Sequence, residues 1–70
     1  MIKMFVSDSC GECEKLKPFI PEGGIQIINT STDDGYSEAM FESVYAIPTI
    51  ILDGHRFSGF YACQKFLRGE

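Results

Sequence analysis

The sequence has no tryptophan, only three prolines and no long run of apolar residues. Because a membrane-spanning helix needs about 20 consecutive apolar residues, the chain offers no candidate for one. Its six basic residues are scattered and are outnumbered by ten acidic residues, which argues against a surface for nucleic acid. The first ten residues also lack the basic stretch, long apolar segment and cleavage site of a secretory signal. We therefore expect a cytoplasmic protein that binds neither nucleic acid nor membrane.

Cysteine is scarce and odd in number, with three residues in a chain of 70. A secreted disulfide framework usually has an even number of cysteines, so this class is not favoured. Two of the three, Cys10 and Cys13, form a C-x-x-C motif. In a cytoplasmic protein such a pair is typical of redox or metal chemistry rather than of a structural staple.

Size and composition favour one small domain that spans residues 1–70. Hydrophobic residues make up 44% of the chain, and six phenylalanines and three tyrosines are among its aromatic residues. This supply of apolar side chains is enough for a core without a metal or disulfide. We expect the domain to be a monomer.

Apolar patterning and turn residues predict seven elements in the order β-α-β-α-β-β-α. Strands separated by helices pair in parallel through right-handed crossovers, and the Asp53-Gly54 turn adds an antiparallel hairpin. The expected fold class is therefore α/β, with a four-stranded mixed sheet flanked by helices. The strands are predicted at 2–7, 25–29, 49–52 and 55–60, and the helices at 11–20, 35–46 and 61–69.

Two details of these helices can be predicted. Pro18 should kink the first helix or end it early, because proline lacks an N–H and crowds the preceding turn. In the second helix, apolar side chains recur at helical spacing and indicate a core-facing stripe. This stripe is made of Tyr36, Met40 and Val44, with Phe41 and Tyr45 beside them.

Cys10 and Cys13 fall where the first strand gives way to the first helix. A helix start carries unpaired N–H groups and the positive end of the helix dipole, which together stabilise a thiolate. A thiolate so placed is an efficient nucleophile, and a second thiol one turn further can resolve the mixed disulfide. We therefore predict Cys10 as the nucleophile and Cys13 as the resolving cysteine.

Three neighbours are expected to tune the acidity of the Cys10 thiol: Asp8, Gly11 and Glu12. The carboxylates of Asp8 and Glu12 disfavour the thiolate, and Lys15 and Lys17 offset them only in part. A less stabilised thiolate favours a reducing pair, with a potential nearer about −270 mV than about −120 mV.

A metal site is the main alternative for these cysteines. Zinc could be held by Cys10, Cys13, His55 and Cys63, although the last two lack the tight spacing usual in structural zinc sites. Copper, or an iron–sulfur cluster shared between two copies, uses the same first pair. Cys63 has a simpler interpretation as a small buried apolar residue in the last helix.

The chain resembles a thioredoxin-fold redoxin of the short glutaredoxin type over nearly its whole length. The residues that carry the resemblance are "CGEC" at 10–13, "KLKP" at 15–18, "AIPT" at 46–49 and "FSGF" at 57–60. The resemblance implies that Pro48 follows a cis peptide bond and faces the cysteines. It also implies that Ile47 pairs with the substrate backbone, and that Gly59 and Phe60 border the same groove.

Departures from the glutaredoxin pattern bear on the partners. Glutaredoxins usually have proline and an aromatic residue where this chain has Gly11 and Glu12. The "SGF" stretch at 58–60 is similar to that of redoxins that donate electrons to ribonucleotide reductase and are recharged by thioredoxin reductase. Phe60 would crowd the glycyl end of glutathione, and Glu12 would repel its carboxylates.

These observations predict a dithiol oxidoreductase that reduces a disulfide-containing protein, and the resemblance implies that this protein could be ribonucleotide reductase. No bound cofactor is expected beyond the Cys10–Cys13 disulfide. Electrons would come from thioredoxin reductase and NADPH, or from glutathione in the alternative of a glutathione-dependent glutaredoxin.

Overall fold

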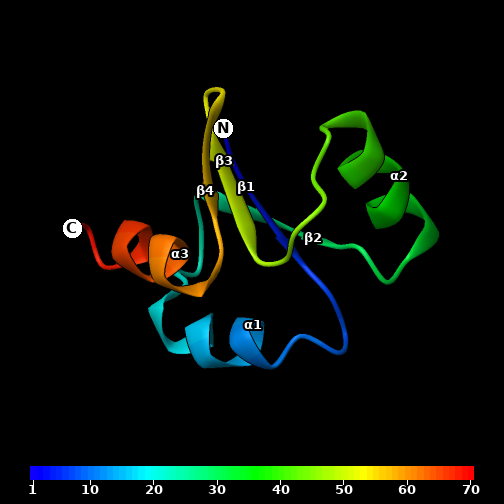
Figure 1. Cartoon of the computed structure of the whole chain (residues 1–70). Helices are drawn as coiled ribbons and strands as arrows, with labels where there is room; N and C mark the ends of the chain where they lie inside the picture. The colour runs from blue at the N-terminus through cyan, green and yellow to red at the C-terminus, as the bar shows by residue number, and fades with distance from the viewer.

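The computed structural model describes all 70 residues and places a four-stranded sheet between two layers of helix (Figure 1). Helices α1 and α3 lie together on one side of the sheet, and α2 lies on the other (Figure 1). The strands are β1 (Ile2–Val6), β2 (Ile25–Asn29), β3 (Thr49–Leu52) and β4 (His55–Ser58). The helices are α1 (Gly11–Leu16), α2 (Asp33–Phe41) and α3 (Phe60–Leu67), and the 3-10 helix η1 (Lys17–Phe19) follows α1. The predicted fold class and order of elements are confirmed.

The sheet topology gathers the candidate residues at one end of the molecule. The strand order is β2-β1-β3-β4, with β1 parallel to β2 and antiparallel to β3. Phe5 is opposite Thr49, and Thr49 is opposite Ser58 in the antiparallel hairpin. The chain therefore leaves β1, β2 and β4, and enters β3, at the same end of the sheet. We call this the Cys10 end.

Two apolar clusters form the core, one on each face of the sheet. On the α2 side, Phe5 and Ile28 pack with Ala39 and Val44. On the other side, Met4, Leu16, Ile50 and Cys63 have no exposed surface. Successive strand residues point to opposite faces, which is why neighbours such as Met4 and Phe5 belong to different clusters.

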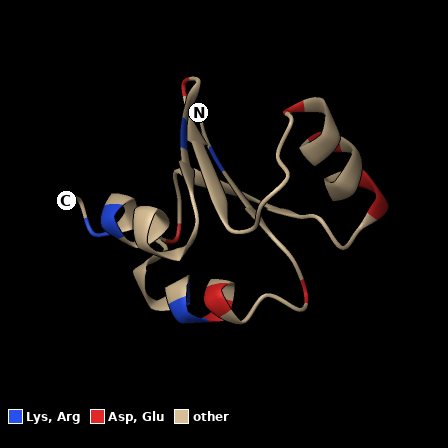
Figure 2. Ribbon diagram, in the orientation of Figure 1, with Lys and Arg blue, Asp and Glu red and all other residues tan.

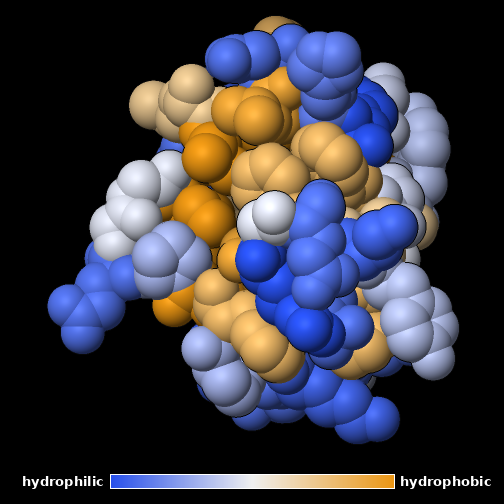
Figure 3. All heavy atoms as spheres, turned by 90° about the vertical axis from the view of Figure 1, so that its left-hand side faces the viewer, coloured by the Kyte–Doolittle hydropathy of each residue, from blue (hydrophilic) through white to orange (hydrophobic).

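The face of the molecule that carries α3 is partly apolar. The face that carries α3 and the C-terminus shows apolar atoms beside hydrophilic ones (Figure 3). Phe57 of β4 and Phe66 of α3 pack against each other, with ring centroids 4.8 Å apart, and both pack on the cluster that contains Leu16. None of the three helices is long and apolar enough to span a bilayer.

Helix α1 ends early, as the position of Pro18 predicts. The α-helical part stops at Leu16, and Pro18 lies near the start of η1. A proline is accepted in a first turn because its missing N–H would be unpaired there in any case. The change to a 3-10 turn lets the chain leave the helix and reach β2.

Helix α2 differs from its prediction at both ends. It begins at Asp33 because the Thr32 hydroxyl caps it, accepting the Gly35 N–H at 3.0 Å. It ends at Phe41 rather than at 46, because Ser43 adopts a left-handed conformation with φ of 59°. The Ser43 N–H then donates to Met40 O at 3.1 Å, and the Val44 N–H donates to Ala39 O at 2.8 Å. This pair of bonds is a Schellman motif, which closes the helix.

The predicted core stripe is wrong except for Val44. Val44 turns inward and is 4% exposed, whereas Tyr45 turns outward and is 82% exposed. Within the helix, Tyr36, Met40 and Phe41 are 58%, 41% and 86% exposed. The helix instead faces the sheet with Gly35 and Ala39. Three other elements differ from their predicted bounds by one or two residues. Strand β1 stops at Val6, β4 stops at Ser58, and α3 begins at Phe60.

Candidate functional site

Cys10 is the N-cap residue of α1. Its backbone is extended, with φ of −97° and ψ of 100°, and its Sγ accepts the Cys13 N–H at 3.0 Å. The Glu14 N–H donates to the Cys10 carbonyl at 3.3 Å. A cap side chain normally offers an oxygen to these N–H groups, and here a sulfur takes that place. The same N–H can stabilise a thiolate on Cys10 through a charge-assisted bond.

The two cysteines are joined and differ in exposure. Their sulfurs lie 2.20 Å apart, and their Cα atoms lie 5.2 Å apart. Cys10 is half-buried, whereas Cys13 is 4% exposed and faces the sheet from the buried side of α1. A macromolecule approaching this disulfide can therefore reach the sulfur of Cys10 more readily than that of Cys13.

Pro48 and Gly59 lie side by side at the Cys10 end. The Ile47–Pro48 peptide bond is cis, as the resemblance implies, and the Pro48 side chain is fully buried. The Gly59 N–H donates to the Pro48 carbonyl at 2.9 Å. Gly59 has φ of 92°, a conformation that glycine adopts without the steric cost other residues meet. Phe60 begins α3, is half-buried, and packs on the cluster that contains Leu16.

The three predicted tuning residues occupy different environments. Asp8 is exposed, but its carboxylate accepts the Asn29 Nδ2–H at 2.8 Å and its N–H donates to Ser31 Oγ at 3.0 Å. Those bonds hold Asp8 toward the end of β2. Glu12 is exposed in the first turn of α1, and a Cβ added to Gly11 would meet no other group within 4 Å.

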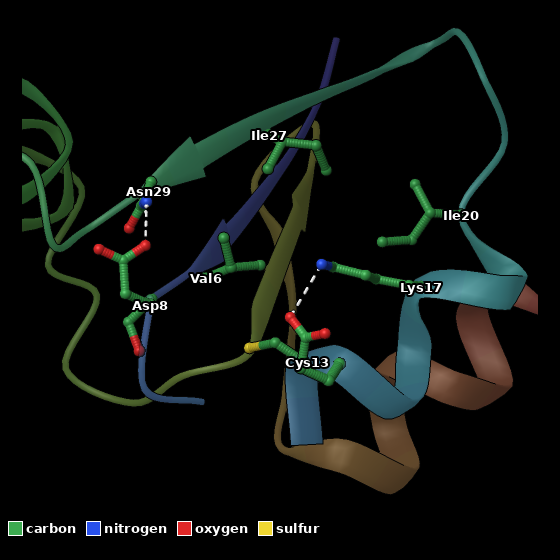
Figure 4. A pocket seen from close by; sticks show the side chains of 9 residues that line it. Val6, Asp8, Cys13, Lys17, Ile20, Ile27 and Asn29 are labelled. Carbon is green, nitrogen blue, oxygen red and sulfur yellow. Dashed lines mark hydrogen bonds and ion pairs between the residues drawn. The ribbon is translucent and has the colours of Figure 1, made fainter. Parts of the chain in front are cut away.

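A pocket of about 520 Å³ lies behind Cys13, between α1 and β2, and the sequence did not predict it. Figure 4 shows the Cys13 sulfur and the Asp8 carboxylate on its edge, with Ile27 of β2 across from them. The pocket exists because α1 covers β2 incompletely, which leaves Ile27 47% exposed. Lys17 points across it and pairs with Glu14 at 2.9 Å, so its charge is already partnered (Figure 4).

The four residues considered as zinc ligands do not come together. His55 lies opposite Leu52 beside the β3–β4 turn, at the far end of the sheet from Cys10. Cys63 is fully buried, its thiol donates to the Phe57 carbonyl at 3.2 Å, and desolvation raises the pKa of Cys63 to about 11. No three His, Cys, Asp or Glu side chains in the structure are grouped so that they could hold a metal ion. The interpretation of Cys63 as a small buried residue is confirmed.

Comparison with known proteins identifies the fold. No family model and no curated protein matches the chain. Among solved structures it is similar to the thioredoxin-like protein BC3987, with a TM-score of 0.70 and 19% identity over 96% of this chain and 99% of that chain. A mutant of that protein, with alanine in place of a threonine, matches with a TM-score of 0.67 and 19% identity over 86% of each chain. The chain therefore has the thioredoxin-like fold, with a cysteine pair where the first strand leads into the first helix.

Proposed function

We propose that this protein is a small dithiol oxidoreductase that reduces disulfide bonds in other proteins. The observation that supports this most directly is the asymmetric cysteine pair. Cys10 is half-buried and caps α1, and Cys13 lies beneath it at disulfide distance with its N–H on the Cys10 sulfur. A two-step exchange needs a nucleophilic thiol that the substrate protein can reach and a resolving thiol that is shielded from it.

The reaction begins with the dithiol form. The Cys10 thiolate attacks one sulfur of a substrate disulfide, which forms a mixed disulfide and releases the other substrate sulfur as a thiolate that takes a proton from water. Cys13 then loses its proton to water, and its thiolate attacks the Cys10 sulfur. The second substrate sulfur leaves as a thiolate, which takes a proton from water. Two electrons have passed to the substrate, and the Cys10–Cys13 disulfide has formed.

The backbone around Ile47 supports a substrate groove at the Cys10 end. Neither the N–H nor the carbonyl of Ile47 is bonded to another backbone group. A free donor and a free acceptor next to a sheet can pair with an extended peptide as an additional strand does. In this proposal Pro48, Gly59 and Phe60 complete the border of the groove.

Thioredoxin reductase with NADPH is the proposed source of electrons in the cytoplasm, and a protein such as ribonucleotide reductase is the proposed acceptor. Exposed Glu12 stands next to the disulfide and disfavours an anionic tripeptide such as glutathione. Phe60, at the border of the groove, leaves less room there than glycine would.

Reduction of insulin tests this function. The protein is supplied with NADPH and thioredoxin reductase, or with NADPH, glutathione and glutathione reductase, and the rates are compared. We expect the first system to be faster, and we expect Cys10→Ser to abolish turnover in both. Cys63→Ala serves as a control that keeps the exchanging pair.

Unchanged turnover in Cys10→Ser would refute the proposed function, and faster recharging by glutathione would refute the proposed reductant. Metal analysis of protein purified under reducing conditions addresses the alternative role. Stoichiometric zinc, copper or iron without insulin reduction would show that the cysteines bind metal instead.

A further inference from the structure

A small apolar hollow lies between α2 and the segment that leads from α2 to β3. Its volume is about 230 Å³. Ala39 and Val44 form its floor and are 2% and 4% exposed, whereas Tyr36 and Tyr45 line it and are 58% and 82% exposed. We call it the tyrosine pocket. It exists because the Schellman motif ends α2 early, which turns Val44 inward and leaves Tyr45 outside.

The tyrosine pocket adjoins the proposed substrate groove. Ile47 lines the pocket with its side chain, and its unbonded backbone groups precede the cis-Pro48 bond. Thr30, which also lines the pocket, directly follows β2 and so lies at the Cys10 end. A substrate segment that pairs with the Ile47 backbone would therefore place a neighbouring side chain next to the pocket.

The size and lining of the pocket suit one large apolar side chain. Pockets for whole small molecules usually measure about 300–1,000 Å³, which is larger than this hollow. Tyrosine is enriched among the residues that dominate binding energy at protein interfaces. Exposed apolar groups that gather in one place, as Tyr36, Met40 and Tyr45 do, mark interaction surfaces more often than single exposed residues do.

The charge around the pocket selects the kind of partner. Helix α2 has acidic residues along its length and no basic residue (Figure 2). Asp33 and Asp34 in its first turn make no ion pair, whereas Glu38 and Glu42 each lie 2.8 Å from the ammonium of Lys3. Arg56 donates to the carbonyls of Glu42 and Ser43 at the end of α2, so two cations, Lys3 and Arg56, face the four carboxylates. The surface remains net acidic, which favours a cationic segment over an anionic one.

We propose that the tyrosine pocket binds a large apolar side chain, such as phenylalanine or leucine, of the disulfide-bearing segment of the substrate protein, and that basic residues flank this side chain. The inference rests on the proposed function and deepens it by naming the class of substrate. Tyr36 and Tyr45 are the specificity residues, and they act through binding rather than through the chemistry of the sulfurs.

Synthetic peptides provide the test. Each peptide carries two lysines and one cysteine blocked as a disulfide with thionitrobenzoate, and phenylalanine is placed at successive positions on either side of the cysteine. A matched peptide has serine instead. The Cys10 thiolate of the reduced protein attacks the peptide sulfur, and the thionitrobenzoate that leaves is measured by its absorbance.

We expect at least one phenylalanine position to react about tenfold faster than the serine peptide, at the lower end of what an apolar pocket gives for one group. Tyr45→Ser and Tyr36→Ser should remove most of this preference. Phe41→Ser is the matched control, because Phe41 is 86% exposed on the same helix but does not line the pocket. Phe41→Ser should also keep the wild-type rate with free dithiobis(nitrobenzoate), and thermal unfolding verifies that all three variants are folded.

Equal rates for all peptides, or an equal loss in Phe41→Ser and Tyr45→Ser, would overturn the inference. So would equal rates for peptides with glutamate in place of lysine. If the pocket were covered by a second copy of the chain, sedimentation would show a dimer that Tyr45→Ser weakens, and the inference would again be wrong. Failure of the proposed function looks different, because insulin reduction would then persist in Cys10→Ser. If insulin reduction depends on Cys10 but the peptides show no preference, only the proposed role of the tyrosine pocket is refuted.

Discussion

Replacement of Gly35 by alanine should strongly destabilise the protein, because there is no room for a side chain at this position. Gly35 lies in the first turn of α2, against the last residue of β2. A Cβ atom there would be 1.8 Å from the Asn29 carbonyl oxygen, 2.5 Å from its carbon and 2.9 Å from Thr32 Oγ1. The first two are backbone atoms of a paired strand, so they cannot rotate away. The start of α2 must therefore move off the sheet.

The size of the effect follows from what this movement disturbs. Overpacking of a core costs about 1–3 kcal/mol. Loss of the Thr32 cap, whose hydroxyl accepts the Gly35 N–H at 3.0 Å, costs about 1 kcal/mol more. We expect Gly35→Ala to lower the free energy of unfolding by about 2–4 kcal/mol out of the roughly 5–15 kcal/mol typical of a domain. For a domain of this size, that is a fall in Tm of about 10–30 °C.

Urea unfolding of the oxidised protein, followed by circular dichroism, measures this change. Gly11→Ala is the matched control, because a Cβ at Gly11 meets nothing within 4 Å. It should be neutral or should stabilise the fold by up to about 1 kcal/mol, since alanine is the better helix former. If Gly35→Ala unfolds at the same urea concentration as the wild type, then α2 does not pack against β2 in the way described, and the reasoning fails.

Three further predictions concern the helix end, the buried thiol and the resolving cysteine. Ser43→Gly should stabilise the fold by about 0.5–1 kcal/mol in urea unfolding, because glycine adopts the left-handed conformation without strain; Gly69→Ala, at the equivalent position after α3 with φ of 78°, should destabilise it. Burial raises the pKa of Cys63 to about 11, so the folded state favours the neutral thiol. This contribution is fully present below the ordinary thiol pKa near 8.5–9 and is lost as the pH rises through 11, by up to about 2–3 kcal/mol. Unfolding measured from pH 8 to 11 should show a larger loss in the wild type than in Cys63→Ala, which keeps the loss from Lys3, whose pKa is also raised by its hydrogen bonds to Glu38 and Glu42. Finally, Cys13→Ser should accumulate a mixed disulfide between Cys10 and the substrate, detected as a mass increase that dithiothreitol removes; its absence would mean that Cys13 is not the resolving thiol.

The sequence was sufficient to predict the order of elements and the position of the cysteine pair. Both depend on local signals: alternating apolar residues in the strands, the Asp53-Gly54 turn, and the change to helical spacing after Cys10. The early end of α1 followed from Pro18 in the same way. Burial of Cys63 could be predicted because it shares an apolar stripe with Leu67.

The end of α2 could not be predicted, because the signal that ends the helix is unusual. Apolar residues continue at helical spacing beyond Phe41, and no glycine interrupts them before Pro48. Ser43 occupies the left-handed position that glycine usually takes, so the sequence carries no local warning. The tyrosine pocket was missed as well, because it forms between α2 and the segment that leaves the helix at Val44 and Tyr45.

The pocket behind Cys13 was missed for a different reason. It depends on how far α1 extends over β2, and this is a tertiary property that no local pattern encodes. Asp8 is hydrogen-bonded to Asn29 and Ser31, which lie about twenty residues further along the chain. Nothing in the sequence links these two residues to the cysteines.

The hairpin turn at Asp53 and Gly54 offers a practical use of the arrangement of the sheet. Both residues have positive φ, 48° and 87°, which is the backbone shape that a two-residue hairpin requires. The strand register places this turn as far from the disulfide as the sheet allows, with the exposed N-terminal amine 3.6 Å from the Asp53 carboxylate. A fluorescent label or an inserted epitope at this tip would be separated from the exchanging sulfurs by the full length of the hairpin strands. The molecule could then be followed in living cells while its thiol chemistry remained undisturbed.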